Sequence, residues 1–413
     1  MIRGMIERDR QDGTGTARER ILVVCTRYVG DTVLAIPFLR NLRRAHPDAV
    51  IDVFAERAAR EVLAACPYHD ALVAWERPRR SWLASLAGLR ATAAMLRGRG
   101  YSRAYLLKRS TSAALLAWLA GIPRRIGFAS EVGRALLTTA VRVPRGRHQV
   151  QAYLDQLRAE GLVVDDGRNE NWVPEPVAAR SSALLAALPA ARPRVLLAVR
   201  GTDAARFWRF DRWARLVEWL VREKGCEIVL CGAPADSAAH RRLEAAADPA
   251  VASHIHDFSR AVPLREAGGL IARMDLCIGV DTGLVHLAAS FGVPATVLVG
   301  PTDPNQWSPW MTRSAVVRST RVVRGPFDRL RAWLRPHRER PLRWTQGRAS
   351  MDDIAVADVI EQVAELLPAR PPRPVDPAPV MRTIDLRDGA FNYAVLSRSA
   401  TAVPATKPLA HAH

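Results

Sequence analysis

The pattern that most constrains this chain is an alternation of short apolar runs with amphipathic stretches. Apolar runs of the length of a buried strand begin at Ile21, Ile51, Ala71 and Ala104. Stretches with helical periodicity, such as residues 81–96, lie between them. Strands that alternate with helices are typical of a parallel sheet covered on both faces. The first half of the chain is therefore predicted to be a doubly wound unit.

The same alternation restarts after a segment at 174–193 that contains several prolines. Apolar runs follow at 194–199, 227–231, 276–280 and 295–299, with helical stretches between them. The predicted fold class is α/β, with two Rossmann-like doubly wound domains that face each other across a cleft. Ligands bind beyond the carboxyl ends of the strands in such sheets, so we expect the site in that cleft. The predicted division is a disordered leader at 1–19, domains at 20–173 and 194–368, a linker at 174–193, and a Pro-rich, loosely ordered tail at 369–413.

The net charge is strongly positive and restricts the partners. The chain carries a formal charge of +19, mostly from arginine. Such a field attracts nucleic acid, an anionic membrane surface or an anionic glycolipid, and charge alone does not choose among them. Ten arginines lie between 318 and 348, together with Trp333 and Trp344. This basic segment is interpreted either as a peripheral membrane contact or as a solvated loop.

Cysteine usage and hydropathy point to a protein of a reducing compartment. The five cysteines are scattered and lie mostly within apolar runs, which predicts buried thiols rather than disulfides or zinc ligands. The first twenty residues contain no apolar stretch typical of a signal peptide, and glycines and prolines interrupt the uncharged stretch 282–302. We therefore expect a cytoplasmic location, with any membrane attachment being peripheral.

The sharpest chemical signal lies in the segment 279–304. Asp281 follows an apolar run, and Thr282 and Gly283 open a helical stretch whose free N–H groups and dipole suit a phosphate. His286 follows one turn later on the same helix face. The residues alone leave a second interpretation open. In it, Asp281 and Thr282 are helix caps, and His286 is a half-buried histidine with satisfied hydrogen bonds.

A second candidate is Asp31, which follows Gly30 at the turn after the first apolar run. A carboxylate can take the proton of a hydroxyl as that hydroxyl attacks, so Asp31 is a candidate general base. The residues alone favour a second interpretation, in which Asp31 is the N-cap of the helical stretch that follows. One carboxylate does not easily fill both roles, because a capping carboxylate points toward its own helix.

Several of these motifs, in the same order, resemble glycosyltransferase family 9, the lipopolysaccharide heptosyltransferases. The resemblance covers most of residues 21–310. It is carried by the segment 279–304 together with Gly30 to Pro37, Leu42 to Arg44, Gly121 to Phe128, Arg206 to Trp208, and Trp213. It implies the GT-B architecture, with the acceptor at the first domain and a nucleotide sugar at the second. Many family members have a cysteine-bearing loop before the last helix, and residues 343–351 of this chain contain no cysteine.

The resemblance also implies the reaction and the roles of the site residues. The activity would be metal-independent, inverting transfer of a sugar from an ADP-linked donor, most simply ADP-heptose, to an anionic lipid-linked saccharide. No cofactor is expected. Asp31 would be the general base, and Arg206, at a position where compared relatives have lysine, would stabilise the leaving diphosphate. The donor contacts would be Asp281 at the sugar, Thr282, Gly283 and His286 at the phosphates, and Asp236 at the ribose.

Three alternatives remain at this stage. Without the resemblance, Arg206 would be interpreted as a surface arginine in a loop. The chain could be a transferase for another nucleotide sugar, because donor identity is not legible in the motifs. It could also be a non-catalytic basic protein that binds nucleic acid or a membrane, which would explain the charge.

Overall fold

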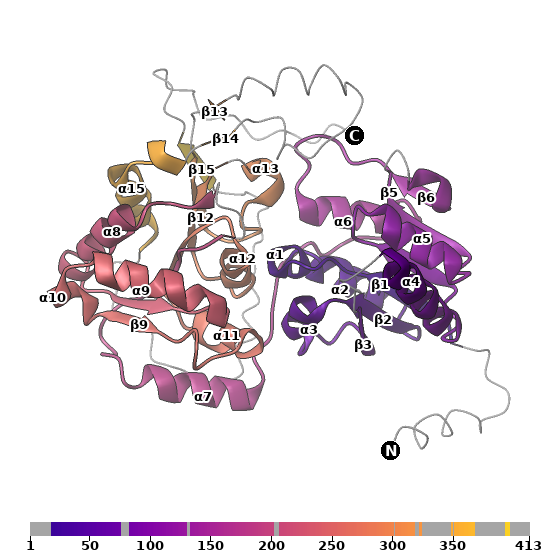
Figure 1. Cartoon of the computed structure of the whole chain (residues 1–413), viewed down its shortest axis with the longest axis horizontal. Helices are drawn as coiled ribbons and strands as arrows, with labels where there is room; N and C mark the ends of the chain where they lie inside the picture. The colour runs from indigo at the N-terminus through magenta and orange to yellow at the C-terminus, as the bar shows by residue number, and fades with distance from the viewer. Residues whose placement is uncertain are drawn as a thin grey trace.

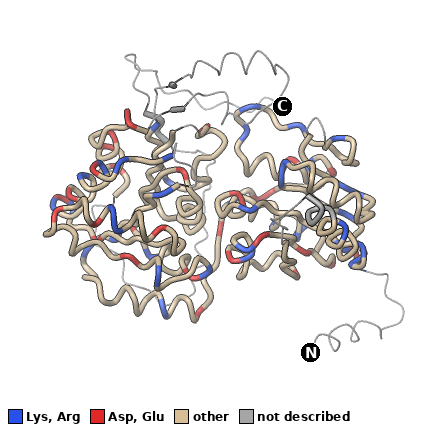
Figure 2. The backbone as a smooth tube through the Cα atoms, viewed as in Figure 1, with Lys and Arg blue, Asp and Glu red and all other residues tan. Residues whose placement is uncertain are grey.

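The structure is a computed structural model that describes residues 18–75, 82–129, 133–201, 206–300, 302–318, 322–323, 348–349, 351–367 and 393–396. It contains two α/β halves lying side by side, each built on its own parallel sheet (Figure 1). Basic and acidic residues occur in both halves (Figure 2). The predicted α/β class with two Rossmann-like domains is confirmed.

The first half is a parallel sheet with helices on both faces. Its strands are β1 (Arg20–Val24), β2 (Val50–Ala55), β3 (Ala71–Ala74), β4 (Arg103–Leu106), β5 (Arg124–Phe128) and β6 (Thr139–Val141). Its helices are α1 (Val29–Val33), α2 (Ile36–Ala45), α3 (Arg57–Leu63), α4 (Trp82–Arg97), α5 (Thr111–Leu119) and α6 (Gln149–Arg158), with a 3-10 turn at Arg134–Leu136. The strand order is β3-β2-β1-β4-β5-β6. β1 is therefore central, and it is buried beyond its first residue, as an apolar strand covered on both faces should be.

The second half repeats this design with a longer sheet. Its strands are β7 (Arg194–Ala198), β8 (Glu227–Leu230), β9 (Ile255–Asp257), β10 (Leu276–Val280), β11 (Ala295–Val299), β12 (Ser314–Arg318) and β15 (Tyr393–Leu396). Its helices are α7 (Glu175–Leu185), α8 (Phe210–Arg222), α9 (Ser237–Ala246), α10 (Pro249–Ala252), α11 (Leu264–Ile271), α12 (Gly283–Ser290), α13 (Pro304–Trp307) and α15 (Val356–Leu366), with 3-10 turns at Pro234–Asp236 and Met351–Asp353. The order is β15-β12-β11-β10-β7-β8-β9, and a separate antiparallel pair joins β13 (Val322–Val323) to β14 (Arg348–Ala349).

Two segments differ from their expected character. The segment 174–193, expected to be a linker, contains helix α7, whose Ala178 and Leu185 are buried in the same apolar cluster as Leu270 of α11. Proline at the start of α7 favours this helix, because the first turn needs no N–H donor there. The tail 369–413 contributes β15, which pairs with β12. The rest of the tail and most of the basic segment 318–348 lie outside the described residues.

The chain crosses back to the first half after β11, and this return holds the halves together. Trp310 packs in the core of the first half, where its ring stacks on His148 with the ring centres 4.3 Å apart. The Val150 amide donates to His148 Nδ1 at 3.3 Å, so the ring proton is on Nε2, which donates to the Ser308 carbonyl at 3.0 Å. Burial lowers the pKa of His148 to about 4, and the ring is therefore neutral at physiological pH. The orientation of the two halves is thus fixed by direct contacts.

Candidate active site

Asp31 lies in the first turn of α1, the short helix that follows β1. This helix begins at Val29, its N-cap is Tyr28, and no side chain makes a capping hydrogen bond. The interpretation of Asp31 as an N-cap is therefore wrong, because the helix starts two residues before it. Asp31 is partly buried, and its carboxylate is not used to cap its own helix.

Three polar side chains from the second half meet at the start of α12, and we call them the Arg206 cluster: Arg206, Asp281 and His286. Nη1 of Arg206 donates to the backbone carbonyl of Asp281 at 2.8 Å and lies 3.2 Å from its Oδ2. Nε2 of His286 lies 3.8 Å from Oδ1 of the same carboxylate. The side chain of Arg206 is only 16% exposed, so it is an anchored arginine and not a surface one.

Thr282 occupies the N-cap position of α12, as the capping interpretation predicts, but neither Thr282 nor Asp281 makes a capping hydrogen bond through its side chain. Thr282 is the N-cap residue, with extended backbone, yet its hydroxyl makes no capping hydrogen bond. The carboxylate of Asp281 faces Arg206 and His286 instead of the helix N–H groups. The first N–H groups of α12 are therefore not satisfied by the side chains expected to cap them.

The two halves touch where α1 meets α12, and glycines make this contact possible. A Cβ atom built on Gly30 would lie 2.7 Å from Cδ2 of His286, and one built on Gly283 would lie 2.6 Å from Cβ of Val29. Any side chain at either position would push the helices apart. Val29 therefore occupies the space beside the backbone of Gly283 in this structure. The same contact brings Asp31 next to the Arg206 cluster.

The electrostatic environment of Asp31 suits a proton acceptor. Burial raises its pKa to about 6, His286 and Arg206 oppose the rise, and the negative charge of Asp281 adds to it. A carboxylate with a raised pKa holds a proton more strongly than an ordinary aspartate and is still largely ionised at pH 7.5. This is the property that a general base needs near neutral pH.

The pKa of Asp281 is shifted in the opposite direction to that of Asp31. Burial works to raise the pKa of Asp281, but the neighbouring His286 and the charge of Arg206 outweigh it and hold the pKa below its ordinary value.

Nδ1 of His286 is buried and has no hydrogen-bond partner in the part of the chain that the structure describes. A buried polar atom without a partner is costly, so this nitrogen is a candidate ligand contact. The interpretation of His286 as a fully satisfied histidine is therefore wrong.

Comparison with known proteins places this arrangement in a family. The model of glycosyltransferase family 9 (heptosyltransferase) matches residues 89–329, more than half of the chain. The chain belongs to glycosyltransferase family 9. The enzyme is 26% identical to lipopolysaccharide heptosyltransferase 2 of Salmonella typhimurium over 312 residues, 72% of this chain and 88% of that protein. It is 25% identical to a lipopolysaccharide heptosyltransferase 3 of Escherichia coli over 352 residues, 83% of this chain and 98% of that protein.

Solved structures agree on the fold of this glycosyltransferase. A family 9 glycosyl transferase from Veillonella parvula superposes with a TM-score of 0.69 at 21% identity, covering 86% of this chain and 99% of the other. The ADP-heptose lipopolysaccharide heptosyltransferase II of E. coli gives 0.66 at 24% identity, covering 84% and 98%. These likenesses confirm the GT-B architecture.

Asp236 of the glycosyltransferase is held by its own turn. It ends the 3-10 turn after β8, at the carboxyl edge of the same sheet as Asp281. Its carboxylate accepts hydrogen bonds from Nη1 of Arg200 and from the Ala233 amide, both at 2.9 Å. The expected ribose contact would therefore share this carboxylate with Arg200. Arg200 was not predicted as a site residue, although its place two residues after β7 was a signal that could have found it.

Within the described ranges, no group of three or more His, Cys, Asp or Glu residues is placed to hold a metal ion. No helix of the described chain is long and apolar enough to cross a membrane. All five cysteines are buried free thiols, which confirms the prediction of buried thiols without disulfides.

Proposed function

We propose that this glycosyltransferase moves heptose from ADP-heptose to a hydroxyl of an anionic lipid-linked saccharide of the lipopolysaccharide core type, with inversion at the anomeric carbon. The names of the relatives support the donor and acceptor classes. The observation that carries the proposal is the meeting of Asp31 with the Arg206 cluster where α1 contacts α12. A cytoplasmic location belongs to the same proposal.

In this mechanism Asp31 acts on the acceptor. Its ionised carboxylate takes the proton of the acceptor hydroxyl while the hydroxyl oxygen bonds to the anomeric carbon. The bond from that carbon to the donor's diphosphate oxygen breaks on the opposite face, which inverts the configuration. Asp31 belongs to the first half and the Arg206 cluster to the second, so acceptor and donor would be held by different halves.

The Arg206 cluster acts on the leaving group. The guanidinium of Arg206 is oriented by Asp281 through Nη1 and brings positive charge to the departing diphosphate. Thr282 and the N–H groups of α12 add hydrogen-bond donors, and Nδ1 of His286 is a further contact. ADP would be the leaving group, and no metal or cofactor takes part in this proposal.

An anionic acceptor fits the charges at the carboxyl edge of the first sheet. Arg27 follows β1 and is exposed, and Lys108 and Arg109 follow the adjacent strand β4. The guanidinium of Arg109 lies 4.8 Å from the ring centre of Phe128, which holds it at this edge. Three cations beside the strand that leads to Asp31 would attract phosphate or carboxylate groups of the acceptor.

The proposal predicts how activity depends on pH. Only the ionised form of Asp31 can accept a proton, so kcat/KM should be flat above about pH 7 and fall roughly tenfold per pH unit below about pH 6. Initial rates measured between pH 5 and 8 with constant ionic strength test this. A profile without a break in that range would exclude Asp31 as the base.

The donor site is tested by thermal shift, because a ligand that binds only the folded state raises the melting temperature. ADP-heptose should raise Tm of the wild type. Arg206→Gln should weaken its apparent affinity by about 10- to 100-fold, the scale of a charge-assisted hydrogen bond. Thr282→Val should weaken it by roughly fivefold, because it removes a neutral donor.

Arg209→Gln is the matched control, since Arg209 lies three residues further on and is exposed. It should bind the donor like the wild type. Stabilisation by a different nucleotide sugar alone would show another donor. Salt-sensitive nucleic acid binding without stabilisation by any sugar nucleotide would favour a non-catalytic binding protein.

A further inference from the structure

A stretch of the first half contains many basic residues and no acidic one. Residues 77–130 include eleven Arg and Lys but no Asp or Glu, although acidic residues make up about a tenth of the chain. The stretch contains β4, β5 and the helices α4 and α5. A surface built from it has no carboxylate of its own to repel an anionic partner.

The helices α4 and α5 pack together on one face of the first sheet (Figure 1). Ala93 and Leu96 of α4 share an apolar cluster with Ala113 and Leu116 of α5. The guanidinium of Arg97 at the end of α4 donates to the carbonyl of Leu119 at the end of α5. The two helices therefore present one continuous outer surface.

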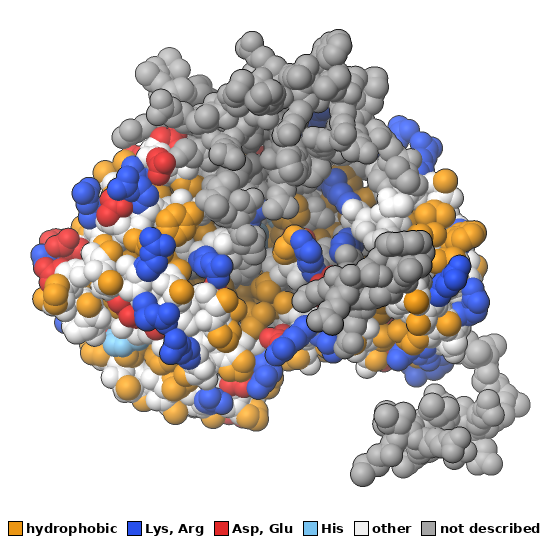
Figure 3. All heavy atoms as spheres, viewed as in Figure 1, with side chains coloured by type: hydrophobic (Ala, Val, Ile, Leu, Met, Phe, Trp, Pro, Cys, Tyr) orange, Lys and Arg blue, Asp and Glu red, His pale blue; other side chains and the backbone are white. Residues whose placement is uncertain are grey.

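This outer surface is apolar and basic at the same time. Trp118 of α5 is 52% exposed and Met95 of α4 is 38% exposed, and both belong to a short set of large hydrophobic side chains that the described chain leaves in solvent. Arg90 of α4 is exposed as well. Figure 3 shows hydrophobic and basic side chains together over this part of the first half. An exposed indole among arginines is the composition of a surface that rests in the interfacial layer of a membrane.

The surface also lies close to the proposed acceptor side. Helix α5 begins at Thr111, two residues after Arg109, which follows the carboxyl end of β4 together with Lys108. Trp118 lies seven residues further along, which is about 10 Å along the helix axis. β4 is paired with β1, the strand that leads to Asp31. A lipid-linked acceptor could thus remain anchored in the bilayer while its saccharide reaches the site.

We propose that the outer face of α4 and α5 docks on an anionic phospholipid surface, with Trp118 in the interfacial layer and Arg90 and Arg97 at the lipid phosphates. The docking explains why this face combines exposed apolar and basic groups without acidic ones. The docking itself does not depend on the proposed function. Only its biological role rests on that function, because the lipid-linked acceptor lies in a membrane. The residues of this surface are not those of the basic segment 318–348.

Vesicle sedimentation of the full chain tests the proposal. The probe is large unilamellar vesicles of phosphatidylcholine with 30 mol% phosphatidylglycerol, compared with pure phosphatidylcholine, over a salt series. Trp118→Ser should lower the partition coefficient on anionic vesicles by roughly tenfold. Arg90→Gln should lower it by about fivefold and reduce its salt dependence. Neither change affects a buried contact of the described chain, so Tm should stay within about two degrees.

Two matched control variants change similar residues outside the proposed docking surface. Val163→Ser removes an exposed apolar side chain outside this surface, and Arg241→Gln removes an exposed arginine on α9. Both should bind vesicles like the wild type. Equal binding by Trp118→Ser and wild type, or equal binding to neutral and anionic vesicles, would overturn the proposal. A dimer lost on Trp118→Ser in sedimentation velocity would also overturn it, because a second copy would then cover this face.

Sugar transfer distinguishes this proposal from the proposed function. Trp118→Ser should keep wild-type rates on a deacylated, water-soluble acceptor and lose rate only on acceptor embedded in anionic vesicles. Absence of any transfer by the wild type, with vesicle binding as expected, would contradict the proposed function and leave the docking surface standing.

Discussion

Replacing Asp31 with asparagine should lower turnover by roughly 100-fold or more while leaving ADP-heptose binding nearly unchanged. Asparagine has the same shape but cannot take a proton from the acceptor hydroxyl. The measurements are steady-state turnover with saturating donor and acceptor, and donor affinity by thermal shift. Turnover within about threefold of the wild type would remove Asp31 from the mechanism.

Asp211→Asn is the matched control, because Asp211 also lies in the first turn of a helix, α8, but is exposed and makes its ion pair with Arg209. Both substitutions remove a negative charge from a helix start, where each carboxylate interacts with the helix dipole. Only the change at Asp31 should affect turnover. A loss in both variants would indicate a general effect of charge.

Stability gives a second readout of the same residue. The pKa of Asp31 is raised in the folded state, so its ionisation costs folding free energy as pH rises through the unfolded value near 3.8, and the cost is complete above about pH 6. Asp31→Asn should therefore be as stable as the wild type near pH 3, more stable by roughly half of the full difference at pH 5, and more stable at pH 8 by up to about 3 kcal/mol. A residue with a purely structural role would lose stability on substitution instead.

The fold could be predicted because the strands and helices of a parallel α/β architecture each have a local sequence pattern. Continuous apolar runs predicted strands such as β1, β8 and β10, and the structure has them with shifts of a residue or two at their ends. Short or polar strands such as β6 were missed, because three residues are too few to show the hydrophobic periodicity of a strand. Helix α7 was taken for a linker, because the prolines at its beginning were not interpreted as a signal for the start of a helix.

The sequence predicted which residues form the candidate site but not which of them contact one another. The motifs singled out Asp31, Arg206 and Asp281 from three separate segments, and the structure brings them within electrostatic reach of one another. Sequence reasoning did not show that Gly30 and Gly283 would face each other, since this depends on the relative position of two domains. It also gave no signal for Trp310 packing in the core of the first half, far along the chain.

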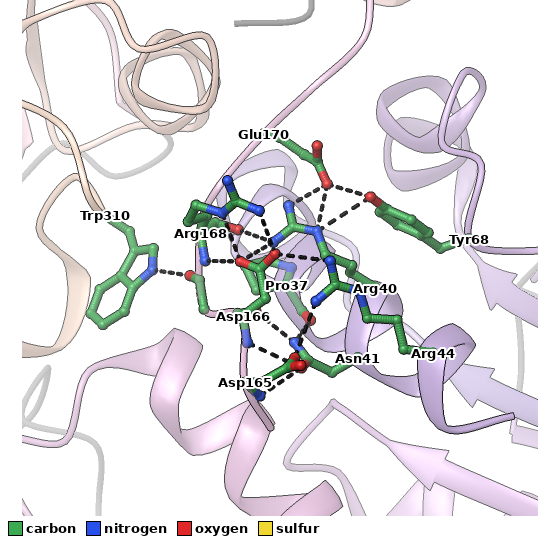
Figure 4. A network of polar contacts seen from close by, with 11 residues as sticks. Pro37, Arg40, Asn41, Arg44, Tyr68, Asp165, Asp166, Arg168, Glu170 and Trp310 are labelled. Carbon is green, nitrogen blue, oxygen red and sulfur yellow. Dashed lines mark hydrogen bonds and ion pairs between the residues drawn. The ribbon is translucent and has the colours of Figure 1, made fainter. Parts of the chain in front are cut away.

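A second large effect is expected at Arg40, whose charge is buried where the chain leaves the first half. Its guanidinium reaches the segment that follows α6 and leads to α7 (Figure 4). Nη1 donates to Oδ1 of Asp166 at 2.9 Å and to the Arg168 carbonyl at 2.8 Å. Nε donates to Oε1 of Glu170 at 2.7 Å, and Tyr68 donates to the same oxygen at 2.6 Å.

Neighbouring residues hold this segment in the same place. The side-chain amide of Asn41 donates to the Asp166 carbonyl at 2.6 Å, and Trp310 donates to the Gly167 carbonyl at 2.7 Å. Burial alone would raise the pKa of Asp166, but hydrogen bonds from Arg168 and the charge of Arg40 hold it well below the ordinary value. The network therefore ties α2, the crossing segment and the second half together.

Arg40→Ala should lower the free energy of unfolding by about 3 to 5 kcal/mol, because Glu170 would lose its pairing with the buried Arg40, and Asp166 would retain Arg168 and Arg44 but lose Arg40. Urea denaturation at pH 7 measures this. Arg44→Gln is the control, since Arg44 is one turn further along α2 and pairs with Asp165 and Asp166 but is half exposed. Its loss should cost less than about 1 kcal/mol.

The pH dependence of that difference identifies its cause. The depressed pKa of Asp166 contributes stability that is present above the unfolded value near 3.8 and is lost as pH falls below it. In Arg40→Ala the carboxyl of Asp166 no longer feels the charge of Arg40 and is expected to protonate more readily, which relieves part of the cost of burying its charge. The gap between wild type and variant should therefore be largest near pH 7 and shrink toward pH 4. A gap that stays constant over this range would mean that Arg40 acts by packing its aliphatic stem and not by neutralising the buried carboxylates.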